Sequence, residues 1–329
     1  MKAAPLLRLV LSVALFLGFA AGIARAQTGD FPNRPIRLLV GFGAGGGTDI
    51  VARIVAQKMA EGLGQSVVVE NRTGASGLIA AEDVAKSPPD GYLLMMGSQT
   101  TLAVAPMLYH KTAALDPAKE FAGVTLTGAS PLALVANTSF AAHSVAEVIA
   151  MAKANPGKIN FGTGGVGTTP HMTAELFQHD AGIKMLHVAY RGEAPAINDT
   201  IAGQIPLMFA NLSAVIGHIK GGTLQAIAVT SAQRSPNVPN VPTISETLPG
   251  FAAETWFGIV TPTGTPRDVL LKLNGAARKA LAASDTKQRL EELGMSNGSS
   301  TPEEFDAYIK SEIAKWSQVI KDANIQPAD

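Results

Sequence analysis

Two glycine-rich segments are the places where this chain is best equipped to bind an anion. Segments 41–47 and 163–169 each follow a short apolar run and precede a helical pattern. At such a position, backbone N–H groups and the positive end of a helix meet the carboxyl end of a strand, where a carboxylate or a phosphate can accept hydrogen bonds. Thr48, Thr168 and Thr169 add hydroxyl groups at the same points. An exposed helix end contributes only about 0.3–1 kcal/mol, so useful affinity requires several donors that converge in a closed cleft.

Both segments also have other interpretations that the sequence leaves open. The glycines can serve only tight turns and helix caps. The run Gly41-Phe42-Gly43-Ala44-Gly45-Gly46 also fits the G-x-G-x-x-G dinucleotide fingerprint, and acidic Glu70 ends the next strand pattern. The export signal described below weighs against a dinucleotide enzyme, because an exported protein has no ready supply of free nicotinamide cofactor.

No familiar catalytic arrangement accompanies these segments. The chain lacks the G-x-S-x-G, G-x-x-x-x-G-K-[ST] and H-E-x-x-H motifs, and none of its six histidines is followed by another four residues later. We therefore expect no catalytic residue, no metal site and no cofactor. His171 either packs in the first turn of its helix or faces a ligand, and Asp49 either stabilises the first turn of its own helix or contacts a ligand. Tyr190-Arg191-Gly192 either reaches the cleft or forms a surface turn.

Composition excludes several classes of protein. The 26 basic and 26 acidic residues give no net charge, which argues against a nucleic-acid binder that neutralises phosphates. A hydrophobic content of 47% with only 16% charged residues is the opposite of the signature of disorder. Because the chain has no cysteine, it has no disulfide scaffold, no thiol nucleophile and no cysteine zinc site.

The first 26 residues have the build of a secretory signal peptide. Lys2 and Arg8 precede an apolar run over residues 9–21, and Ala24-Arg25-Ala26 supplies an A-x-A cleavage site. The alternative is a membrane anchor, but the uninterrupted apolar stretch is short for the ~20 residues that a span needs. We predict cleavage after Ala26 and a periplasmic mature protein.

Strand patterns alternate with helical patterns through most of the remaining chain. Continuous apolar strands that are separated by helices indicate a parallel sheet covered on both faces. Thr48 is expected to cap a helix that runs to about Glu61, and two helices, 267–283 and 302–323, are expected to finish the chain. The expected strands are 36–40, 66–70, 92–96, 121–127, 132–136, 158–162, 185–188, 205–209, 224–229 and 257–260.

A unit of strand, glycine-rich segment and helix occurs twice, near residues 36–61 and 158–180. We therefore expect an α/β protein with two lobes, a parallel-rich sheet in each lobe and a ligand cleft between them. The chain should cross between the lobes near 121–130 and return near 251–260. The predicted division is residues 27–127 plus 255–329 for the first domain and 128–254 for the second.

The motifs along the chain also follow the order of a known family. Arg34-Pro35-Ile36-Arg37 leads into Phe42-x-Ala44-Gly45-Gly46-Gly47-Thr48-Asp49, and Val67-Val68-Val69-Glu70-Asn71-Arg72 follows. Gly162-Thr163-Gly164-x-x-Gly167-Thr168-x-x-His171 and Tyr190-Arg191-Gly192-x-x-Pro195-Ala196 come later. With these motifs the chain resembles the Bug-type receptors, which are the extracytoplasmic solute-binding proteins of tripartite tricarboxylate transporters.

The resemblance implies two α/β domains that close like a flytrap on a small organic acid. It also implies that backbone amides, hydroxyl groups and ordered water of the two facing segments hold the carboxylate of the ligand. Ser98, Tyr190 and Asp199 are cleft residues by the same resemblance. The family usually has proline where Gly43 stands and often glycine where Ser76 stands, and both departures can alter the pocket. Carried over to this chain, the ligand-binding residues of the two segments are Phe42, Ala44, Gly45, Gly46, Gly47, Thr48, Asp49, Thr163, Gly164, Gly167, Thr168 and His171.

We therefore expect a periplasmic receptor that binds a small organic carboxylate and hands it to the membrane subunits of a tripartite tricarboxylate-type transporter. The receptor is expected to be a monomer and to bind no nucleic acid. Two alternatives stay open. One is a ligand sensor that docks on a membrane signalling protein, and the other is an exported enzyme or dinucleotide-binding protein. The identity of the carboxylate is also open.

Overall fold

The computed structural model describes residues 31–109, 115–322 and 325. The chain divides into two units, residues 1–33 and residues 34–329, and the fold described below is that of the second. The predicted signal peptide and its cleavage site lie outside the described residues. Within the described ranges, no helix combines the length and the apolar character needed to cross a membrane.

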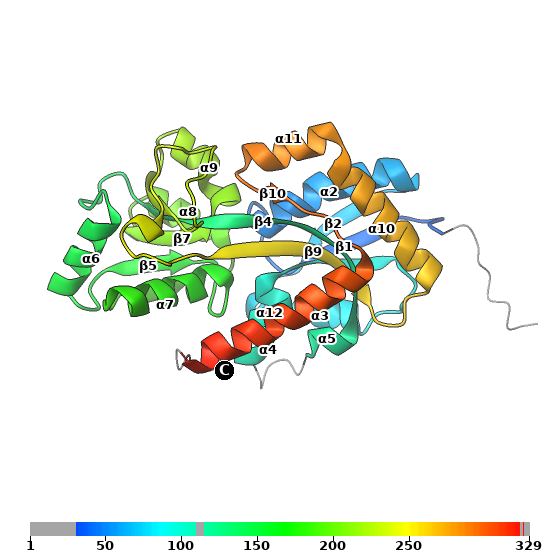
Figure 1. The fold of residues 1–329 in the computed structure, drawn as a ribbon. Coiled ribbons are helices and arrows are strands. Elements are labelled where there is room, and N and C mark those ends of the chain that lie inside the picture. The colour runs from blue at the N-terminus through cyan, green and yellow to red at the C-terminus, as the bar shows by residue number, and fades with distance from the viewer. Residues whose placement is uncertain (1–30, 110–114, 323–324, 326–329) are drawn as a thin grey trace, which may run out of the picture. The chain divides into compact units, whose positions relative to one another are not determined.

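Strands and helices alternate along most of the chain, as Figure 1 shows. The strands are β1 (Ile36–Val40), β2 (Val67–Asn71), β3 (Leu93–Ser98), β4 (Phe121–Ala136), β5 (Asn160–Thr163), β6 (Leu186–Ala189), β7 (Leu207–Asn211), β8 (Gln225–Val229), β9 (Glu254–Pro262) and β10 (Ser296–Asn297). The α-helices are α2 (Gly47–Leu63), α3 (Leu78–Ala85), α4 (Ala105–Leu108), α5 (Pro117–Glu120), α6 (Val145–Ala154), α7 (Thr169–Ala181), α8 (Glu193–Ile201), α9 (Leu212–Lys220), α10 (Arg267–Ala282), α11 (Ser284–Glu292) and α12 (Pro302–Asp322). Three further short helical turns are η1 (Ala75–Gly77), η2 (Thr100–Val104) and η3 (Ile244–Glu246).

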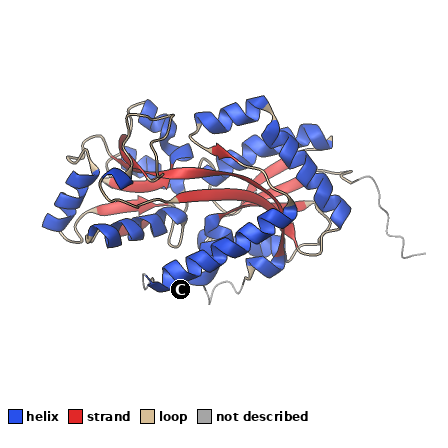
Figure 2. Cartoon of the chain, in the orientation of Figure 1, coloured by secondary structure: helices blue, strands red, loops and turns tan. Residues whose placement is uncertain are grey.

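Two groups of parallel strands are connected by two long antiparallel strands (Figures 1 and 2). Strand β1 pairs in parallel with β2 and β3, and β5 pairs in parallel with β6 and β7. Strands β4 and β9 run side by side in opposite directions between these groups. The structure confirms the predicted α/β fold with two lobes: a first lobe around β1–β3 and a second lobe around β5–β8. The predicted domain boundaries stay a prediction.

The predicted strands 121–127 and 132–136 are wrong as separate elements, because they form one strand, β4, of 16 residues. Gly128 lies inside it with a φ of 143°, a value that glycine adopts without strain. The register with β9 shifts between Gly123 and Thr125 and between Leu126 and Gly128, so the strand bends at bulges instead of ending. Its last five residues, Leu132 to Ala136, pair with β7, and β4 thus carries the chain from the first lobe into the second.

Two predictions about helices also need correction. Thr48 is not the cap of α2, because the helix begins at Gly47 and Gly46 occupies the N-cap position in an extended conformation. Between the two predicted final helices lies an additional one, α11. Ala283, with a ψ of 138°, separates it from α10, and the sequence has no glycine or proline there to mark the break.

Both faces of β7 are buried, and successive side chains of this strand point to opposite faces. Phe209 of β7 packs with Phe161 and Phe177 on one face. Its neighbours Met208 and Ala210 pack on the other face. Burying a large apolar side chain contributes about 1.5–3 kcal/mol, so this packing fixes the position at which β7 ends.

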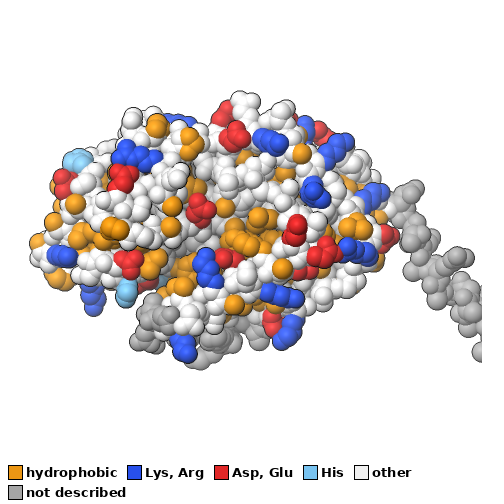
Figure 3. All heavy atoms as spheres, viewed as in Figure 1, with side chains coloured by type: hydrophobic (Ala, Val, Ile, Leu, Met, Phe, Trp, Pro, Cys, Tyr) orange, Lys and Arg blue, Asp and Glu red, His pale blue; other side chains and the backbone are white. Residues whose placement is uncertain are grey.

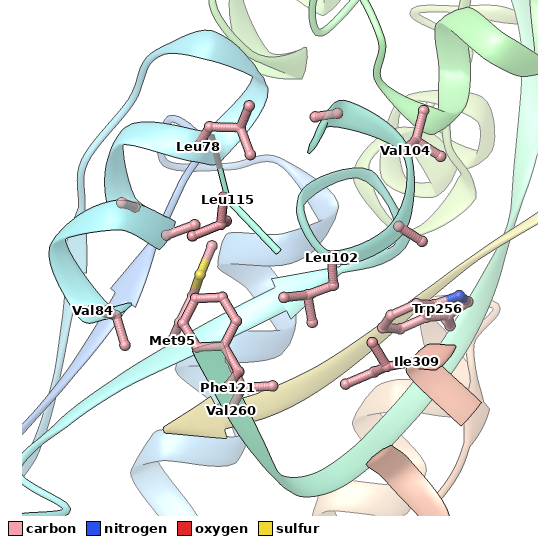
Figure 4. Close-up of a cluster of buried hydrophobic side chains, with 14 of the residues drawn as sticks. Leu78, Val84, Met95, Leu102, Val104, Leu115, Phe121, Trp256, Val260 and Ile309 are labelled. Atoms are coloured by element: carbon pink, nitrogen blue, oxygen red, sulfur yellow. The ribbon is translucent and has the colours of Figure 1, made fainter. Parts of the chain in front are cut away.

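The first lobe has a core in which helices from distant parts of the chain meet β3 and β9. In Figure 4, Met95 lies beside Phe121, Ile309 of α12 lies beside Trp256, and Leu102 lies between these two pairs. The core includes residues of η2, the turn that directly follows β3, and it thereby holds the end of β3 in place.

Charged side chains of both signs are interspersed over the face shown in Figure 3, in keeping with the equal numbers of basic and acidic residues. Exposed ion pairs such as Lys58–Asp285, at 2.9 Å, are typical of this surface. Each such pair contributes only about 0–1 kcal/mol to the free energy of unfolding. The charges on this face therefore do not point to a binding site, and the cavities of the protein are the better candidates.

Candidate functional site

Segments from both lobes meet at the carboxyl ends of the strands. Segment 41–47 follows β1, and Ser98 is the last residue of β3. From the second lobe, segment 164–168 follows β5, segment 190–193 follows β6, and Asn211 is the last residue of β7. In open α/β sheets the crevice outside these strand ends is the usual place for a ligand.

Two adjoining cavities lie between these segments, and Phe42 and Gly164 line both. The larger one, which we call the outer cleft, has a volume of about 470 Å³. The smaller one, the inner pocket, has a volume of about 20 Å³. The outer cleft is lined by Gly41, Phe42, Thr73, Gly74, Ala75, Ser76, Gly77, Tyr109, Gly164, Gly165, Val166, Ala189, Tyr190, Arg191 and Gly192. The inner pocket is lined by Phe42, Gly46, Gly47, Thr48, Ser98, Thr100, Gly164, Thr168, Pro170, Glu193, Asn211 and Thr255.

The structure brings about half of the predicted site residues together at these cavities. Tyr190 lines the outer cleft, whereas Ala44 and Gly45 lie on exposed backbone away from both cavities. The predicted residues at the inner pocket are Phe42, Gly46, Gly47, Thr48, Ser98, Gly164 and Thr168. The predicted residues that line neither cavity are Ala44, Gly45, Asp49, Thr163, Gly167, His171 and Asp199.

Asp49 is turned towards its own loop and helix. Its carboxylate accepts hydrogen bonds from the Gly45 N–H at 3.0 Å, from Arg53 Nε at 2.9 Å and from Asn71 Nδ2 at 2.8 Å. Burial by itself would raise the pKa of Asp49, but these bonds outweigh it and the pKa is lowered. Of the two interpretations that the sequence left open, this geometry favours stabilisation of the loop and the first helical turn.

His171 packs inside the second lobe against a second histidine. Its ring stacks on that of His187 with 4.1 Å between the ring centroids, and its Nδ1 accepts a hydrogen bond from the Gly167 N–H at 3.1 Å. His187 Nε2 in turn lies 2.7 Å from Thr163 Oγ1. Burial, with a smaller contribution from His187, lowers the pKa of His171 to about 3, and burial lowers the pKa of His187 to about 4. Both rings are therefore neutral at pH 7, and the geometry favours the packed interpretation of His171.

Tyr190 lines the outer cleft, and Asp199 fixes the position of its side chain by a hydrogen bond. The Tyr190 hydroxyl donates a 2.7 Å hydrogen bond to Asp199 Oδ2. Burial and this carboxylate raise the pKa of Tyr190 to about 12, so its hydroxyl keeps its proton. Asp199 thus positions a cleft residue and does not line the cleft itself.

Several buried polar atoms of the inner pocket have no hydrogen-bond partner among the described residues. They are Ser98 Oγ, Thr255 Oγ1 and Asn211 Oδ1, on side chains whose residues are only 2%, 2% and 5% exposed. Buried polar groups are nearly always hydrogen-bonded, and leaving one unpaired costs about 1–3 kcal/mol. The pocket is therefore prepared for a polar group that comes from outside the chain.

Sequence reasoning missed Glu193, which lies across the cleft from helix α2. Glu193 Oε2 accepts the Gly47 N–H at 2.9 Å, and Oε1 accepts both the N–H and the Nδ2 group of Asn211, at 2.7 and 2.9 Å. Burial raises the pKa of Glu193, although these three donors act in the opposite direction. At the sequence level, an acid in the first turn of a helix signals only helix stabilisation. Its position directly after Tyr190-Arg191-Gly192 was the one available hint.

Other contacts also join the two lobes. The Thr169 N–H donates to Thr100 Oγ1 at 2.9 Å, and the hydroxyl groups of the same two residues lie 3.1 Å apart. Ser76 Oγ donates to the Val166 carbonyl. Gly47 approaches the second lobe so closely that an added Cβ would lie 2.9 Å from Asn211 Cβ. The two lobes are thus in direct contact around the inner pocket.

Ser76 and Gly43, which depart from the family pattern, differ in their surroundings. Ser76 has a φ of 52°, in the left-handed region where glycine is the ordinary residue. Its side chain nevertheless gains the contact with the second lobe just described. Gly43 lies opposite Gly192, where an added Cβ on Gly192 would be 3.4 Å from the Gly43 nitrogen. Ser76 is among the residues that line the outer cleft, and Gly43 is not.

Comparison with known proteins finds one family. A family profile described as "Tripartite tricarboxylate transporter family receptor" matches residues 51–325. A solved Rhodopseudomonas palustris protein with adipate is 35% identical, with a TM-score of 0.87 over 91% of this chain and 100% of that chain. The periplasmic binding protein BugD is 33% identical, with a TM-score of 0.86 over 90% of this chain and 99% of that chain. MatC from Rhodopseudomonas palustris, with bound malate, is 31% identical, with a TM-score of 0.82 over 88% of this chain and 100% of that chain. These similarities confirm the predicted periplasmic binding protein fold.

Proposed function

The chain belongs to the tripartite tricarboxylate transporter receptor family, as the resemblance to Bug-type receptors indicated, and we propose that it binds a small organic carboxylate between its two lobes. The bound acid is then delivered to the membrane subunits of a tripartite tricarboxylate-type transporter. The adipate and malate in two similar structures support a carboxylate as the ligand class.

The observation that carries this proposal is the pair of cavities at the strand ends. The outer cleft has room for a small acid, and the inner pocket adds the unpartnered hydroxyls of Ser98 and Thr255. Pockets of about 300–1,000 Å³ with a few convergent polar groups are typical of small-molecule sites. The proposed ligand-binding residues are Phe42, Gly46, Gly47, Thr48, Ser98, Gly164, Thr168 and Tyr190.

Export and domain closure complete the proposal. The signal peptide directs the chain to the periplasm and is cleaved after Ala26. Residues 27–127 plus 255–329 and residues 128–254 act as the two domains that close on the acid. A ligand that contacts both lobes stabilises the closed form, because only its differential affinity for the two forms shifts their equilibrium.

The first experiment is a thermal melt of residues 27–329 with mono-, di- and tricarboxylates, amino acids, aromatic acids and NAD. Protein that has been unfolded and refolded during purification avoids ligand carried over from the cell. A ligand at 100 times its Kd adds about 2.7 kcal/mol to the free energy of unfolding, which raises the Tm by several degrees. A shift with one class of acids supports the receptor, whereas a shift with NAD alone would support the dinucleotide interpretation instead. Turnover of the bound acid during a long incubation would indicate an enzyme.

A further inference from the structure

The inner pocket is lined by the buried carboxyl group of Glu193. A site that only binds the carboxylate of a ligand does not need an acidic side chain. Glu193 is 8% exposed, and both of its carboxylate oxygens accept N–H donors from Gly47 and Asn211. No ion pair found within the described part of the chain includes it. The three N–H donors favour the ionised carboxylate, whereas burial raises the pKa of Glu193, and no Lys or Arg lines the inner pocket to offset this rise.

Glu193 changes what the inner pocket can receive. The Gly47 N–H at the start of α2, which an incoming anion would use, is already bound to Glu193. A ligand carboxylate in the same pocket would place two carboxyl groups side by side in a buried site, which disfavours the charged forms of both. The volume of about 20 Å³ also admits only one group of the size of a water molecule. The carboxylate of the ligand therefore belongs in the outer cleft, where Arg191 is the one Lys or Arg among the lining residues described for either cavity.

The atoms that await a partner in the inner pocket include an acceptor as well as donors. Asn211 Oδ1 can only accept a hydrogen bond, whereas the hydroxyl groups of Ser98 and Thr255 can donate or accept. A hydroxyl group of the ligand can donate to Glu193 or Asn211 and accept from Ser98 or Thr255. An ammonium group can donate to all of them, and its positive charge favours the ionised form of Glu193.

Resting on the proposed function, we propose that Glu193 is a specificity-determining residue that selects acids with a hydroxyl or ammonium group next to the carboxylate. The donor group enters the inner pocket, and the carboxylate and the rest of the ligand stay in the outer cleft. An unsubstituted acid has no such donor group. When it binds, Glu193, Asn211 Oδ1 and the two hydroxyl groups gain no hydrogen-bond partner from the ligand. A site built to hydrogen-bond a ligand group discriminates strongly against the analogue that lacks it.

The test is calorimetric titration of the refolded mature chain with matched sets of acids. Each set contains an unsubstituted acid, its 2-hydroxy analogue and its 2-amino analogue: propionate, lactate and alanine; succinate, malate and aspartate; and the corresponding sets from glutarate and adipate. We expect a substituted acid to bind at least 10-fold more tightly than its unsubstituted counterpart. This ratio needs no variant and tests the inference directly.

Variants then test whether Glu193 causes this ratio of affinities. In Glu193→Gln the ratio should fall to within about 3-fold, because the amide cannot ionise and has one accepting oxygen instead of two. The matched control is Glu175→Gln, which removes a carboxylate on α7 that lines neither cavity and should keep the ratio. If Glu193→Gln does not fold, Ser98→Ala replaces it. That variant removes a hydroxyl group without a partner and should lower the ratio, because only the substituted acids place a donor group beside residue 98.

The outcomes separate this inference from the proposed function. Equal binding of substituted and unsubstituted acids would overturn the inference and leave the receptor function intact. A large ratio that persists in Glu193→Gln, or in Ser98→Ala where that variant is used, would overturn the assignment to the inner pocket. If no acid of any set bound, the proposed function would fail and the inference with it.

Discussion

Replacing Gly47 with alanine should prevent full closure of the cleft without weakening the fold. The added Cβ would lie 2.9 Å from Asn211 Cβ and 3.0 Å from Ser213 Oγ. Non-bonded carbon atoms prefer about 3.5–4.0 Å, so these groups must separate by roughly 0.6–1 Å. Asn211 cannot turn aside, because its backbone N–H and its Nδ2 group are both bound to Glu193. The two lobes must therefore move apart instead.

The size of the effect follows from the contact that this movement breaks. The 2.9 Å hydrogen bond from the Gly47 N–H to Glu193 is lost when the lobes separate. A hydrogen bond contributes about 0.5–1.5 kcal/mol when both groups are neutral and about 1.5–3 kcal/mol when one is charged, which together correspond to a rise in Kd of about 2- to 150-fold. The fold itself should be unharmed, because residue 47 is helical and alanine in a helix is favoured over glycine by up to about 1 kcal/mol.

The assay compares the Kd from titration calorimetry with the Tm and with the change in radius of gyration on ligand binding. Gly43→Ala is the matched control, because the nearest atom to its added Cβ is the Arg191 carbonyl oxygen at an ordinary 3.7 Å. We expect Gly47→Ala to bind weakly and to compact little, and the control to behave like the wild type. Wild-type affinity and compaction in Gly47→Ala would refute the claim that the lobes meet at this helix end.

Three further predictions concern other contacts of the site. Thr100→Val removes the acceptor of the Thr169 N–H, and affinity for the acid should fall about 2- to 12-fold, since a neutral hydrogen bond contributes about 0.5–1.5 kcal/mol; unchanged calorimetry would contradict this. Ser76→Gly should raise the Tm, because a non-glycine residue in the left-handed region costs about 1–2 kcal/mol, yet should weaken ligand binding through the lost contact between the lobes; tighter binding would exclude that contact. The pKa values of His171 and His187, about 3 and 4, lie below the usual 6.5, so the unfolded chain takes up more protons as pH falls through the window from 6.5 to 4. The Tm should therefore fall over that window, and a melt series with a flat or rising Tm would show that the rings are not buried in neutral form.

Much of the local structure can be predicted from the sequence, because it depends on neighbours a few residues away. Strand β1 has the expected bounds, and α2 ends at Gly64 in a left-handed conformation. Ser144 caps α6 by accepting the Glu147 N–H, and Thr168 caps α7 by accepting the His171 N–H. The position of both glycine-rich segments at the carboxyl ends of strands follows from the same local patterns.

Where local signals are absent or mixed, prediction from sequence fails. Glycine is typical of turns, so the sequence predicts that Gly128 separates two strands. Within the sheet it only bends β4, because β9 pairs with β4 on both sides of it. His171 and Asp49 carry chemistry that suits a ligand site, but their side chains find partners inside their own lobes. A side chain's type limits what it can bind, and its surroundings determine what it does bind.

By itself, the sequence determined the α/β alternation, the two glycine-rich segments, the balanced charge and the family, all of which are encoded in short motifs and their order. Only the tertiary structure decided which polar atoms of the inner pocket lack a partner. It also decided that Glu193 accepts a hydrogen bond from Gly47 at the start of α2, 146 residues away along the chain. The physical reason is that hydrogen bonding and burial of a side chain depend on every segment that packs around it. Those segments are brought together by the bend in β4 and the pairing of β4 with β9, which no local pattern specifies.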